Sequence, residues 1–268
     1  MRFEEKVAIV TGATSGIGEA AARLLAAEGA RVVVTGRRPD LLDDIAGDLG
    51  GLAVAGDMAD AHHPGAVVRS AVDAFGGVDV LVANAAEGYP ASVADAEDER
   101  WDRTFAVNVS GPMRLARAAL PSMLGRGGGS IVLVGSVMGL FGSAESAAYG
   151  TSKAALLGLV RSIAVDFGPR GVRANAVCPA WVRTPMGDRT VEDLAASLRV
   201  DRDEAYRLAT RHVPLRRAAE AEEIARCIAF LACDDASIVT GAALVADGGQ
   251  TAVDLGGIVF DDAVEETR

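Results

Sequence analysis

The chain has 268 residues, of which 50% are hydrophobic and 24% charged, with a formal net charge of −11. This length and apolar content fit one large α/β domain, spanning residues 1–268, with a substantial buried core. The acidic balance and the lack of a basic run argue against nucleic acid as a partner, and no apolar run approaches the length needed to span a membrane.

The cysteines and the first residues bear on the compartment. Cys178, Cys227 and Cys233 are an odd number at no metal-ligand spacing, which favours reduced thiols, no bound metal and a cytoplasmic location. Residues 1–6 carry two glutamates and lead straight into a strand pattern, which is not typical of a signal peptide.

The first motif is a glycine-rich loop between a strand and a helix. Residues 7–10 are a short apolar run, typical of a strand buried on both faces. The loop Thr11-Gly-Ala-Thr-Ser-Gly-Ile-Gly18 follows, and then a helical apolar pattern that ends before Gly29. In this context the glycines let the backbone approach a pyrophosphate, and the helix N-terminus supplies amides. The loop's predicted dinucleotide-binding residues are Gly12, Thr14, Ser15, Gly16, Ile17 and Gly18.

The end of the second strand, predicted over residues 31–35, bears on the choice of cofactor. NAD sites usually carry an acidic residue there, which binds the ribose 2′-hydroxyl. Here Gly36 is followed by Arg37 and Arg38. Because no carboxylate repels a 2′-phosphate and Arg37 can pair with one, the sequence favours NADP. The alternative is that both arginines are solvated loop charges and that NAD binds.

Further strand patterns alternate with helical patterns, which predicts a parallel, doubly wound sheet of seven strands with helices on both faces. The remaining strands are expected over residues 52–55, 78–82, 130–134, 173–177 and 243–245. Ligands bind outside the carboxyl ends of such strands. The polar or loop residues at those ends are Asp57, Met58, Asn84, Ala85 and Ser136.

A long helix is predicted over residues 98–124, with Asn108 and Pro112 inside it. An interior proline removes one backbone hydrogen bond and kinks a helix, so a carbonyl near Asn108 can be freed to hold a water. The alternative reading of Asn108 is an ordinary polar helix residue.

Tyr149 and Lys153 stand four residues apart at the start of a helix predicted over residues 149–167. That spacing places both side chains on one helix face, where the ammonium is expected to lower the phenol pKa. Ser136, at the end of the fifth strand, can hold a substrate oxygen next to the tyrosine hydroxyl. The trio suits proton exchange with an alcohol or carbonyl, although such a pair also arises by chance on solvated helices.

Taken in order, these motifs resemble those of the short-chain dehydrogenase/reductase family, over about residues 4–250. The resemblance implies a Rossmann-type fold and an oxidoreductase in which Tyr149 is the acid/base, Ser136 orients the carbonyl, and Lys153 lowers the tyrosine pKa and binds the nicotinamide ribose. Asn108 would anchor a water in the proton relay. The resemblance also assigns Pro179, Val182 and Thr184 to the cofactor site. It further implies a homotetramer with an interface built from the two long helices.

The chain departs from the family pattern after the fourth strand, where Ala83-Asn84-Ala85-Ala86 replaces the usual Asn-Asn-Ala-Gly, and after the sixth, where Pro179-Ala180 replaces Pro-Gly. Ala86 and Ala180 stand where the family usually has glycine, which puts the loop shape near the nicotinamide in question. By resemblance, residues 186–212 close over the substrate, and residues 250–268 are a tail with an acidic end that is expected to be mobile. The predicted substrate-contacting residues are Ser136, Met138, Tyr149, Trp181 and Met186, with Phe141 and Tyr206 as further candidates for an apolar pocket.

The leading hypothesis is an NADP-dependent, less favourably NAD-dependent, oxidoreductase acting on a small secondary alcohol or ketone. A 3-oxoacyl thioester on a carrier protein is the runner-up substrate, and a basic docking patch beside the pocket would favour it. A non-catalytic nucleotide-binding relative is the second alternative, against which the four residues Asn108, Ser136, Tyr149 and Lys153 argue. A sugar epimerase or dehydratase of the longer family branch would need a larger C-terminal substrate domain than this chain has room for.

Overall fold

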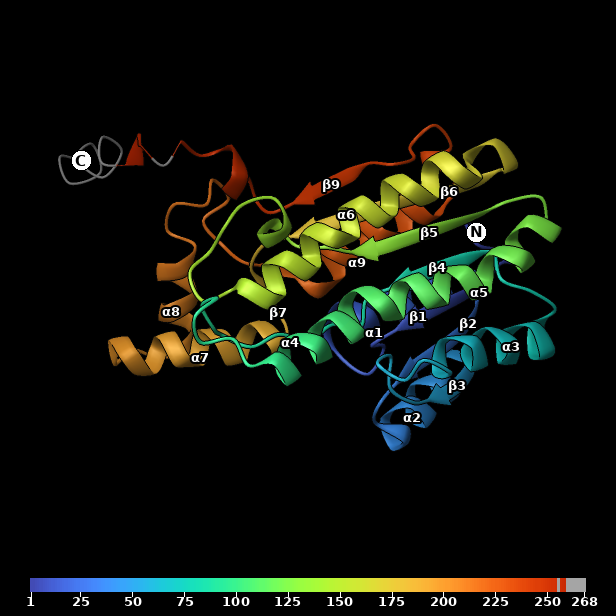
Figure 1. Cartoon of the computed structure of the whole chain (residues 1–268), viewed down its shortest axis with the longest axis horizontal. Helices are drawn as coiled ribbons and strands as arrows, with labels where there is room; N and C mark the ends of the chain where they lie inside the picture. Colours follow the sequence, from blue (N-terminus) through green and yellow to red (C-terminus); the bar gives the residue numbers. More distant parts are fainter. Residues whose placement is uncertain (255, 259–268) are drawn as a thin grey trace.

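Seven parallel strands form the centre of the structure, a computed structural model that describes residues 1–254 and 256–258. Their order is β3-β2-β1-β4-β5-β6-β9, and the carboxyl ends of the labelled strands point to the left in Figure 1. The predicted doubly wound α/β fold is therefore confirmed. The strands are β1 (Val7–Thr11), β2 (Arg31–Gly36), β3 (Leu52–Ala55), β4 (Val80–Ala83), β5 (Gly129–Val134), β6 (Val172–Pro179) and β9 (Ala243–Ala246).

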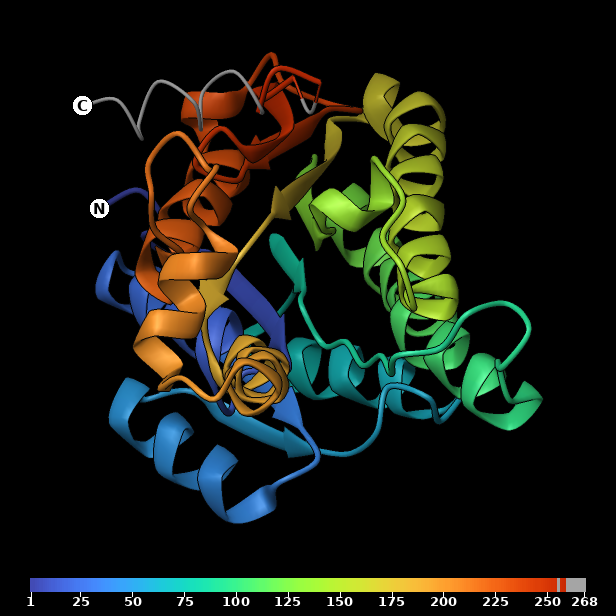
Figure 2. The same ribbon diagram turned by 90° about the vertical axis from the view of Figure 1, so that its left-hand side faces the viewer.

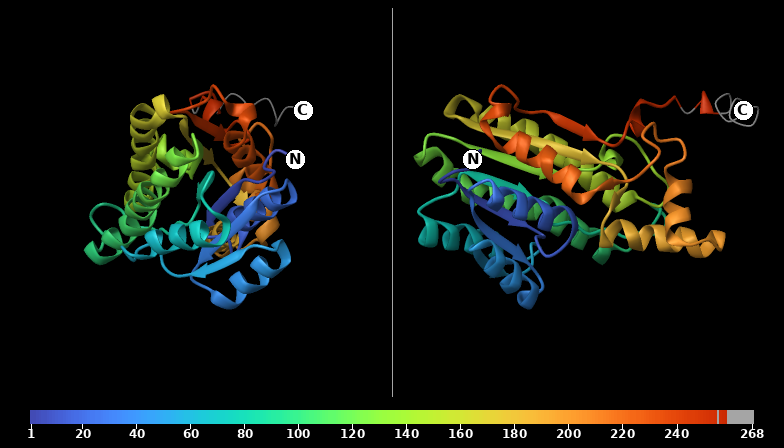
Figure 3. Two further views of the ribbon diagram at one scale, coloured as in Figure 1. Left: turned by 90° about the vertical axis from the view of Figure 1, so that its right-hand side faces the viewer. Right: turned by 180° about the vertical axis from the view of Figure 1, so that it is seen from behind.

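Helices cover both faces of this sheet, as Figures 1 and 3 show. Two separate clusters of buried apolar side chains lie between the sheet and its helices, one on each face. Alternate residues of each central strand point to opposite clusters, which explains their continuous apolar sequence. One face carries α3 (His63–Phe75), α5 (Gly111–Gly125) and α6 (Ala147–Phe167), and the other carries α1 (Gly16–Ala27), α2 (Pro39–Leu49) and α9 (Ala221–Ala232).

The fourth strand begins two residues later than the sequence suggested. Asp79 stands just before β4 and is 8% exposed. Its Oδ2 accepts a hydrogen bond from the Val7 amide at 2.9 Å, and its Oδ1 accepts one from Arg126 Nε, also at 2.9 Å. The start of β4 is thus anchored by a side chain, and β4 proper runs from Val80.

The long helix predicted over residues 98–124 is interrupted. It consists of α4 (Asp98–Phe105), a π-helical turn over Ala106–Ser110, and α5. Pro112 follows the π turn, and the residues on both sides of that turn keep helical dihedral angles, so the proline lies inside the long helix that these three parts form, as expected. The irregularity around Asn108 is the π turn, a feature that often accompanies functional sites.

A cap projects beyond the carboxyl ends of the strands (Figures 1 and 2). It comprises α7 (Pro185–Leu198) and α8 (Arg202–Ala209), which pack around Val191 and Tyr206. The sequence of this region carries two short helical patterns, around residues 191–198 and 203–209, and the structure confirms both helices, with α7 starting six residues earlier than its pattern. A two-stranded parallel sheet of β7 (Val182–Arg183) and β8 (Ala219–Glu220) ties the cap to the domain, and the sequence did not suggest it.

Short 3-10 turns complete the described chain, at Val137–Gly139, Gly168–Arg170, Asp234–Ala236 and Gln250–Ala252. The predicted mobility of the acidic chain end concerns residues outside those described. Within the described part of the chain, no helix combines the length and apolar character required to cross a membrane.

Candidate active site

The glycine loop after β1 is shaped so that a ligand can approach its backbone. Gly12 and Gly16 have φ of +65° and +57°, a region that side chains other than glycine avoid. A Cβ at Gly18 would lie 2.3 Å from the Gly12 carbonyl oxygen, so α1 packs against the loop with no room for a side chain. Because α1 begins at Gly16, its free amides face the loop, and the cradle fits a pyrophosphate.

A hydrogen-bonded seam joins this loop to the end of β4. The Oγ1 of Thr11 accepts from the amides of Asn84 and Ala85, both at 2.9 Å. In return, Asn84 Nδ2 donates to the carbonyl oxygens of Thr11 at 3.0 Å and Gly12 at 3.3 Å. The side chain of Asn84 therefore holds the backbone of the glycine loop in place at Thr11 and Gly12. Sequence reasoning missed Thr11, although a hydroxyl residue directly before the first glycine was a usable signal.

Of the two arginines after β2, Arg38 contacts the glycine loop. Its guanidinium donates to Thr14 Oγ1 at 2.5 Å and to Ser15 Oγ at 3.2 Å. Arg37 points elsewhere: its Nη1 lies 3.7 Å from Glu87 Oε2, and its side chain is 64% exposed. Both cations thus flank the end of β2, and both are exposed.

Asp57 and Met58 follow the end of β3, as the sequence predicted. Asp57 accepts hydrogen bonds from the Ala59 amide at 2.9 Å and from Arg103 at 2.7 Å. Burial raises the pKa of Asp57, but these two hydrogen bonds outweigh burial, and its pKa lies below the usual value. Arg103 also pairs with Glu87, so a chain of alternating charges runs along this edge. Met58 is buried in the core, 5% exposed.

The structure brings the predicted catalytic side chains together. Ser136 follows β5, and its Oγ accepts from the Met138 amide at 3.1 Å and shares a hydrogen bond with Tyr149. Tyr149 and Lys153 lie on the first turns of α6, with Lys153 Nζ 5.5 Å from the centre of the tyrosine ring. Lys153 is 2% exposed, and its Nζ donates to the Val134 carbonyl at 2.7 Å.

The pKa of Tyr149 differs from the expectation. Burial raises it, and the hydrogen bond with Ser136 offsets only part of that effect. The predicted lowering by Lys153 is not found; the ammonium instead donates to the Val134 carbonyl at 2.7 Å. Burial also lowers the pKa of Lys153 to about 8.

Asn108 is 1% exposed and holds three segments together. Its Oδ1 accepts from the Glu87 amide at 2.9 Å, and its Nδ2 donates to the Glu87 carbonyl at 2.8 Å. The same Nδ2 donates to Ser152 Oγ at 2.9 Å, and that hydroxyl donates to the carbonyl of Tyr149 at 2.7 Å. Asn108 is therefore not an ordinary polar helix residue: it links the β4 loop to the turn of α6 that carries the tyrosine.

Pro179, Val182 and Thr184 follow β6, on the path from the sheet to the cap. Thr184 caps α7, accepting from the Gly187 amide at 3.2 Å. A Cβ at Gly16 would lie 2.9 Å from the Thr184 methyl, so the cap rests on the glycine loop. Ala86 and Ala180 are absent from the residues with positive φ, and their backbone conformation therefore accepts alanine in place of the family's glycine.

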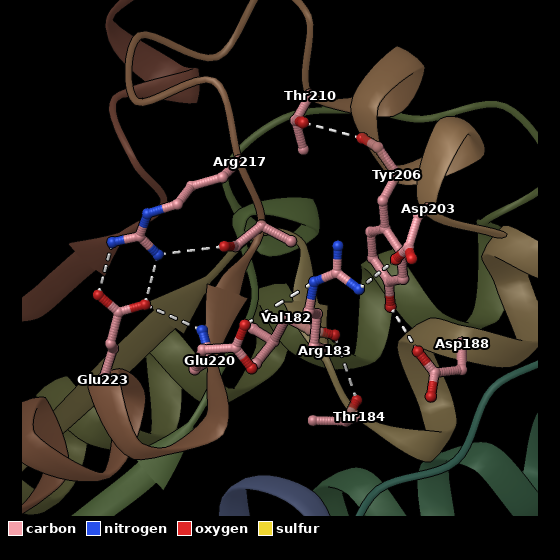
Figure 4. Close-up of polar contacts among 11 residues, drawn as sticks. Val182, Arg183, Thr184, Asp188, Asp203, Tyr206, Thr210, Arg217, Glu220 and Glu223 are labelled. Atoms are coloured by element: carbon pink, nitrogen blue, oxygen red, sulfur yellow. Dashed lines mark hydrogen bonds and ion pairs between the residues drawn. The ribbon is translucent and has the colours of Figure 1, made fainter.

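The residues proposed for an apolar pocket are not equivalent. Trp181 packs against the cap core, whereas Phe141 and Met186 are 40% and 39% exposed. Tyr206 is 2% exposed, and its hydroxyl donates to Asp188 Oδ1 at 2.9 Å. As Figure 4 shows, the tyrosine is a structural member of the cap, and its role as pocket lining is not supported.

Arginine–carboxylate pairs hold the base of the cap (Figure 4). Arg183 donates to Asp203 at 2.9 Å, lies 3.8 Å from Glu220, and stacks 4.5 Å above the centre of the Tyr206 ring. The capping box of Glu220 and Glu223 at the start of α9 adds a second anchor. Within the described ranges, 1–254 and 256–258, no group of three metal-ligating side chains is gathered.

Comparisons with known proteins agree with this geometry. Residues 12–251 match the family model described as enoyl-(acyl carrier protein) reductase. A cis-4-hydroxycyclohexanecarboxylate dehydrogenase from Sinomonas cyclohexanicum is 42% identical over 94% of this chain and 98% of its own length. Human dehydrogenase/reductase SDR family member 4 is 37% identical over 91% of this chain and 87% of its own. The structure of L-sorbose reductase from Gluconobacter frateurii, complexed with NADPH and L-sorbose, superposes with a TM-score of 0.89 at 33% identity, covering 95% of this chain and 100% of the other.

The chain belongs to the short-chain dehydrogenase/reductase family, and the likenesses support an oxidoreductase of that type.

Proposed function

We propose that the protein uses NADP(H) to interconvert a secondary alcohol and its ketone, with Tyr149 as the acid/base. The observation that carries the proposal is the pairing of Ser136 with Tyr149, whose pKa the serine lowers, with Lys153 buried one helical turn away and the glycine cradle at the same edge of the parallel sheet. When bound, the nicotinamide supplies or accepts the hydride. The roles of these three residues come from the resemblance in sequence, and the closeness of their side chains in the structure supports them.

The protein's own residues supply the proton. Because its pKa is raised, Tyr149 is protonated at neutral pH, the form in which it donates to the oxygen of a ketone. The Ser136 hydroxyl stands beside it and can hold the same substrate oxygen. Lys153, with a pKa of about 8, exchanges a proton near neutral pH and is suited to reprotonate the tyrosine. The water that Asn108 is predicted to anchor would connect the two.

The likenesses support an alcohol or ketone substrate. The names of two of the relatives give their substrates as cis-4-hydroxycyclohexanecarboxylate, which is a secondary alcohol, and L-sorbose, which is a ketone sugar. We assay a panel of cyclic ketones, sugar ketones and a 3-oxoacyl thioester, following the absorbance of the reduced cofactor. Turnover of a free ketone supports the proposal, whereas turnover of the thioester alone supports the carrier-protein alternative. If the protein binds the cofactor tightly and turns over no compound of the panel, it is a non-catalytic relative.

The preference for NADP rests on the cations beside the ribose position. Arg37 and Arg38 follow β2, with no carboxylate at Gly36. A charge-assisted pair with a 2′-phosphate contributes roughly 1.5–3 kcal/mol, or about tenfold to a hundredfold in affinity. Arg37→Ala is therefore expected to weaken NADPH binding by about that factor and to leave NADH binding nearly unchanged. Arg38→Ala tests the second cation in the same titration.

The reverse substitution sharpens this test. A Cβ at Gly36 would meet nothing closer than 3.6 Å, the methyl of Thr14, so an aspartate fits there. Gly36→Asp combined with Arg37→Ala is expected to reverse the preference, since the carboxylate binds a free 2′-hydroxyl and repels a phosphate. Equal affinity of the unmutated protein for NADH and NADPH would contradict the NADP assignment.

The same proposal includes the surroundings of the site. We assign residues 186–212, which include all of α7 but its first residue and the whole of α8, to covering the substrate, because the cap rests on the glycine loop at Thr184. We place the protein in the cytoplasm as a homotetramer with α4–α5 and α6 at one twofold interface. The free thiols of Cys178, Cys227 and Cys233 fit a reducing compartment. Light scattering that shows a monomer at micromolar concentration would contradict the assembly.

A further inference from the structure

The loop between β4 and α4 lies directly against the ring of Tyr149. Its closest approach is at Gly88, where the backbone packs on the ring face. A Cβ added at Gly88 would lie 2.7 Å from Tyr149 Cδ2 and 3.1 Å from its Cβ and Cγ. The first of these distances is shorter than carbon atoms tolerate without displacement. Only glycine therefore lets the loop and the ring share this space.

The loop is fixed immediately before Gly88. The backbone of Glu87 exchanges two hydrogen bonds with the side chain of Asn108, at 2.9 and 2.8 Å. Asn108 in turn holds Ser152, which bonds the Tyr149 carbonyl. The position of the loop and the position of the tyrosine backbone are thus set by one buried asparagine.

The loop is fixed again three residues after Gly88. The Ala91 amide donates to the Glu145 carbonyl at 2.9 Å, and the Ala147 amide donates to the Ala91 carbonyl at 3.2 Å. Tyr89, between these points, is 9% exposed beneath the Arg100 guanidinium, which lies 3.9 Å from its ring centre. Both ends of the segment are therefore held to the start of α6, and the loop cannot retreat from the ring without breaking these contacts.

We infer that Gly88 is a positioning residue for the catalytic tyrosine: its bare backbone backs the Tyr149 ring and sets where the hydroxyl stands relative to Ser136. This inference rests on the proposed function, in which Tyr149 exchanges the proton. Because the loop is held at both ends, a side chain at residue 88 displaces the ring and moves the hydroxyl away from the serine.

The first test is the Gly88→Ala variant, compared with Gly47→Ala. Gly47 lies on the exposed side of helix α2, and a Cβ there would meet nothing within 4 Å. Gly88→Ala is expected to lower kcat by about tenfold to a hundredfold, as small misplacements of a reacting group do. The Kd for the reduced cofactor, measured by fluorescence titration, is expected to stay within about twofold. Gly47→Ala is expected to match the parent in both.

A pH profile separates positioning from a simple loss of folded enzyme. The hydrogen bond with Ser136 lowers the pKa of Tyr149, so a displaced ring that loses this bond has a higher pKa. Alcohol oxidation requires the deprotonated tyrosine, and its rising limb is therefore expected to shift to higher pH in Gly88→Ala. An unchanged limb and an unchanged kcat, with Tyr149→Phe inactive, would overturn the role of Gly88 and leave the proposed function standing.

A double variant keeps the test decisive if Gly88→Ala does not fold. Tyr149→Ala removes the two ring atoms that the new Cβ would meet, Cδ2 at 2.7 Å and Cγ at 3.1 Å, and keeps only the less severe 3.1 Å contact with the Cβ of residue 149. The double variant Gly88→Ala with Tyr149→Ala is therefore expected to show the melting temperature and cofactor affinity of Tyr149→Ala alone. If the double variant is as poorly folded as Gly88→Ala, the obstruction is not the ring, and the inference is wrong.

Discussion

The carboxyl edge of the sheet and the cap above it hold their polar groups in different ways. At the edge, Asn108, Lys153 and Ser136 are each less than 9% exposed and bond to backbone atoms, Asn108 and Lys153 to those of other segments and Ser136 to the amide of its own turn. In the cap, Arg183 and Asp203 pair with each other, and their side chains are 39% and 81% exposed. Buried hydrogen bonds are costly to break, whereas exposed ion pairs contribute little and are screened by salt.

This difference suggests a division of labour. The groups assigned to proton transfer are held by buried hydrogen bonds, and moving them would cost the free energy of breaking those bonds. Their geometry is therefore fixed before any ligand binds. The cap has a small apolar core around Val191 and Tyr206 and an exposed ionic base. It can therefore vary or move at a lower cost, which suits a segment proposed to cover the substrate.

The largest expected effect comes from crowding the glycine cradle. Gly18→Ala places a Cβ 2.3 Å from the Gly12 carbonyl oxygen and 2.4 Å from Asn84 Nδ2. We expect it to weaken cofactor binding by more than about tenfold and to destabilise the fold by roughly 1–3 kcal/mol or more, as overpacking does. Titration and urea unfolding measure both, with Gly47→Ala as the control. Parent-like affinity in Gly18→Ala would show that α1 does not pack on the loop as described.

The next prediction concerns the buried Lys153. Burial lowers its pKa from 10.5 to about 8. Between these two pKa values, Lys153 is protonated in the unfolded chain and deprotonated in the folded protein. Its contribution to the free energy of unfolding therefore rises as the pH goes from about 8 to about 10.5. Below about pH 8 the ammonium is charged in both states, and the destabilisation caused by burying it is constant. The total change is about 3 kcal/mol. We measure the free energy of unfolding of the parent minus that of Lys153→Met across this range. A flat difference would indicate that Lys153 is not buried as a cation at neutral pH.

A smaller effect is expected inside the cap. Tyr206→Phe removes the hydroxyl that donates to Asp188 at 2.9 Å and keeps the ring in place. The free energy of unfolding is expected to fall by about 1 kcal/mol, because Asp188 is partly exposed and regains water. If the cap covers the substrate, KM for the substrate rises while the cofactor Kd is unchanged. An altered cofactor Kd with an unaltered KM would contradict that assignment.

The smallest effect is expected at the ionic base of the cap. Arg183→Gln removes pairs with Asp203 and Glu220 and the contact with the Tyr206 ring. Since these partners are largely exposed, the loss is expected to stay below about 1 kcal/mol and to shrink in high salt. Unfolding at low and high salt checks this. A loss above that of Tyr206→Phe at both salt concentrations would mean that the cap is held by charge and not by its core.

The sheet and the cradle could be predicted because their signals are local. The apolar run of β1, the glycines after it and the spacing of Tyr149 and Lys153 each lie within a few consecutive residues. The pattern of alternating strands and helices then leaves few topologies open. For the same reason both cap helices were expected, since each has its own periodic pattern.

Contacts between distant segments could not be predicted. The sheet of β7 and β8 pairs residues far apart in a stretch with two residues per strand, too short for any periodic signal. The packing of Gly88 on Tyr149 joins a loop to helix α6 over 61 residues of sequence, and a glycine alone does not reveal what it approaches. The raised pKa of Tyr149 depends on burial and on the direction of the Lys153 side chain, which spacing does not determine.

The most direct test of the account is the turnover of Tyr149→Phe beside its cofactor affinity. The substitution keeps the ring against Gly88 and removes the one proton that the tyrosine exchanges. We predict that kcat falls by about 10²- to 10⁴-fold, the contribution typical of a general acid, while NADPH binds with parent affinity. A Tyr149→Phe enzyme that retains near-parent turnover would contradict the central claim that this tyrosine is the acid/base.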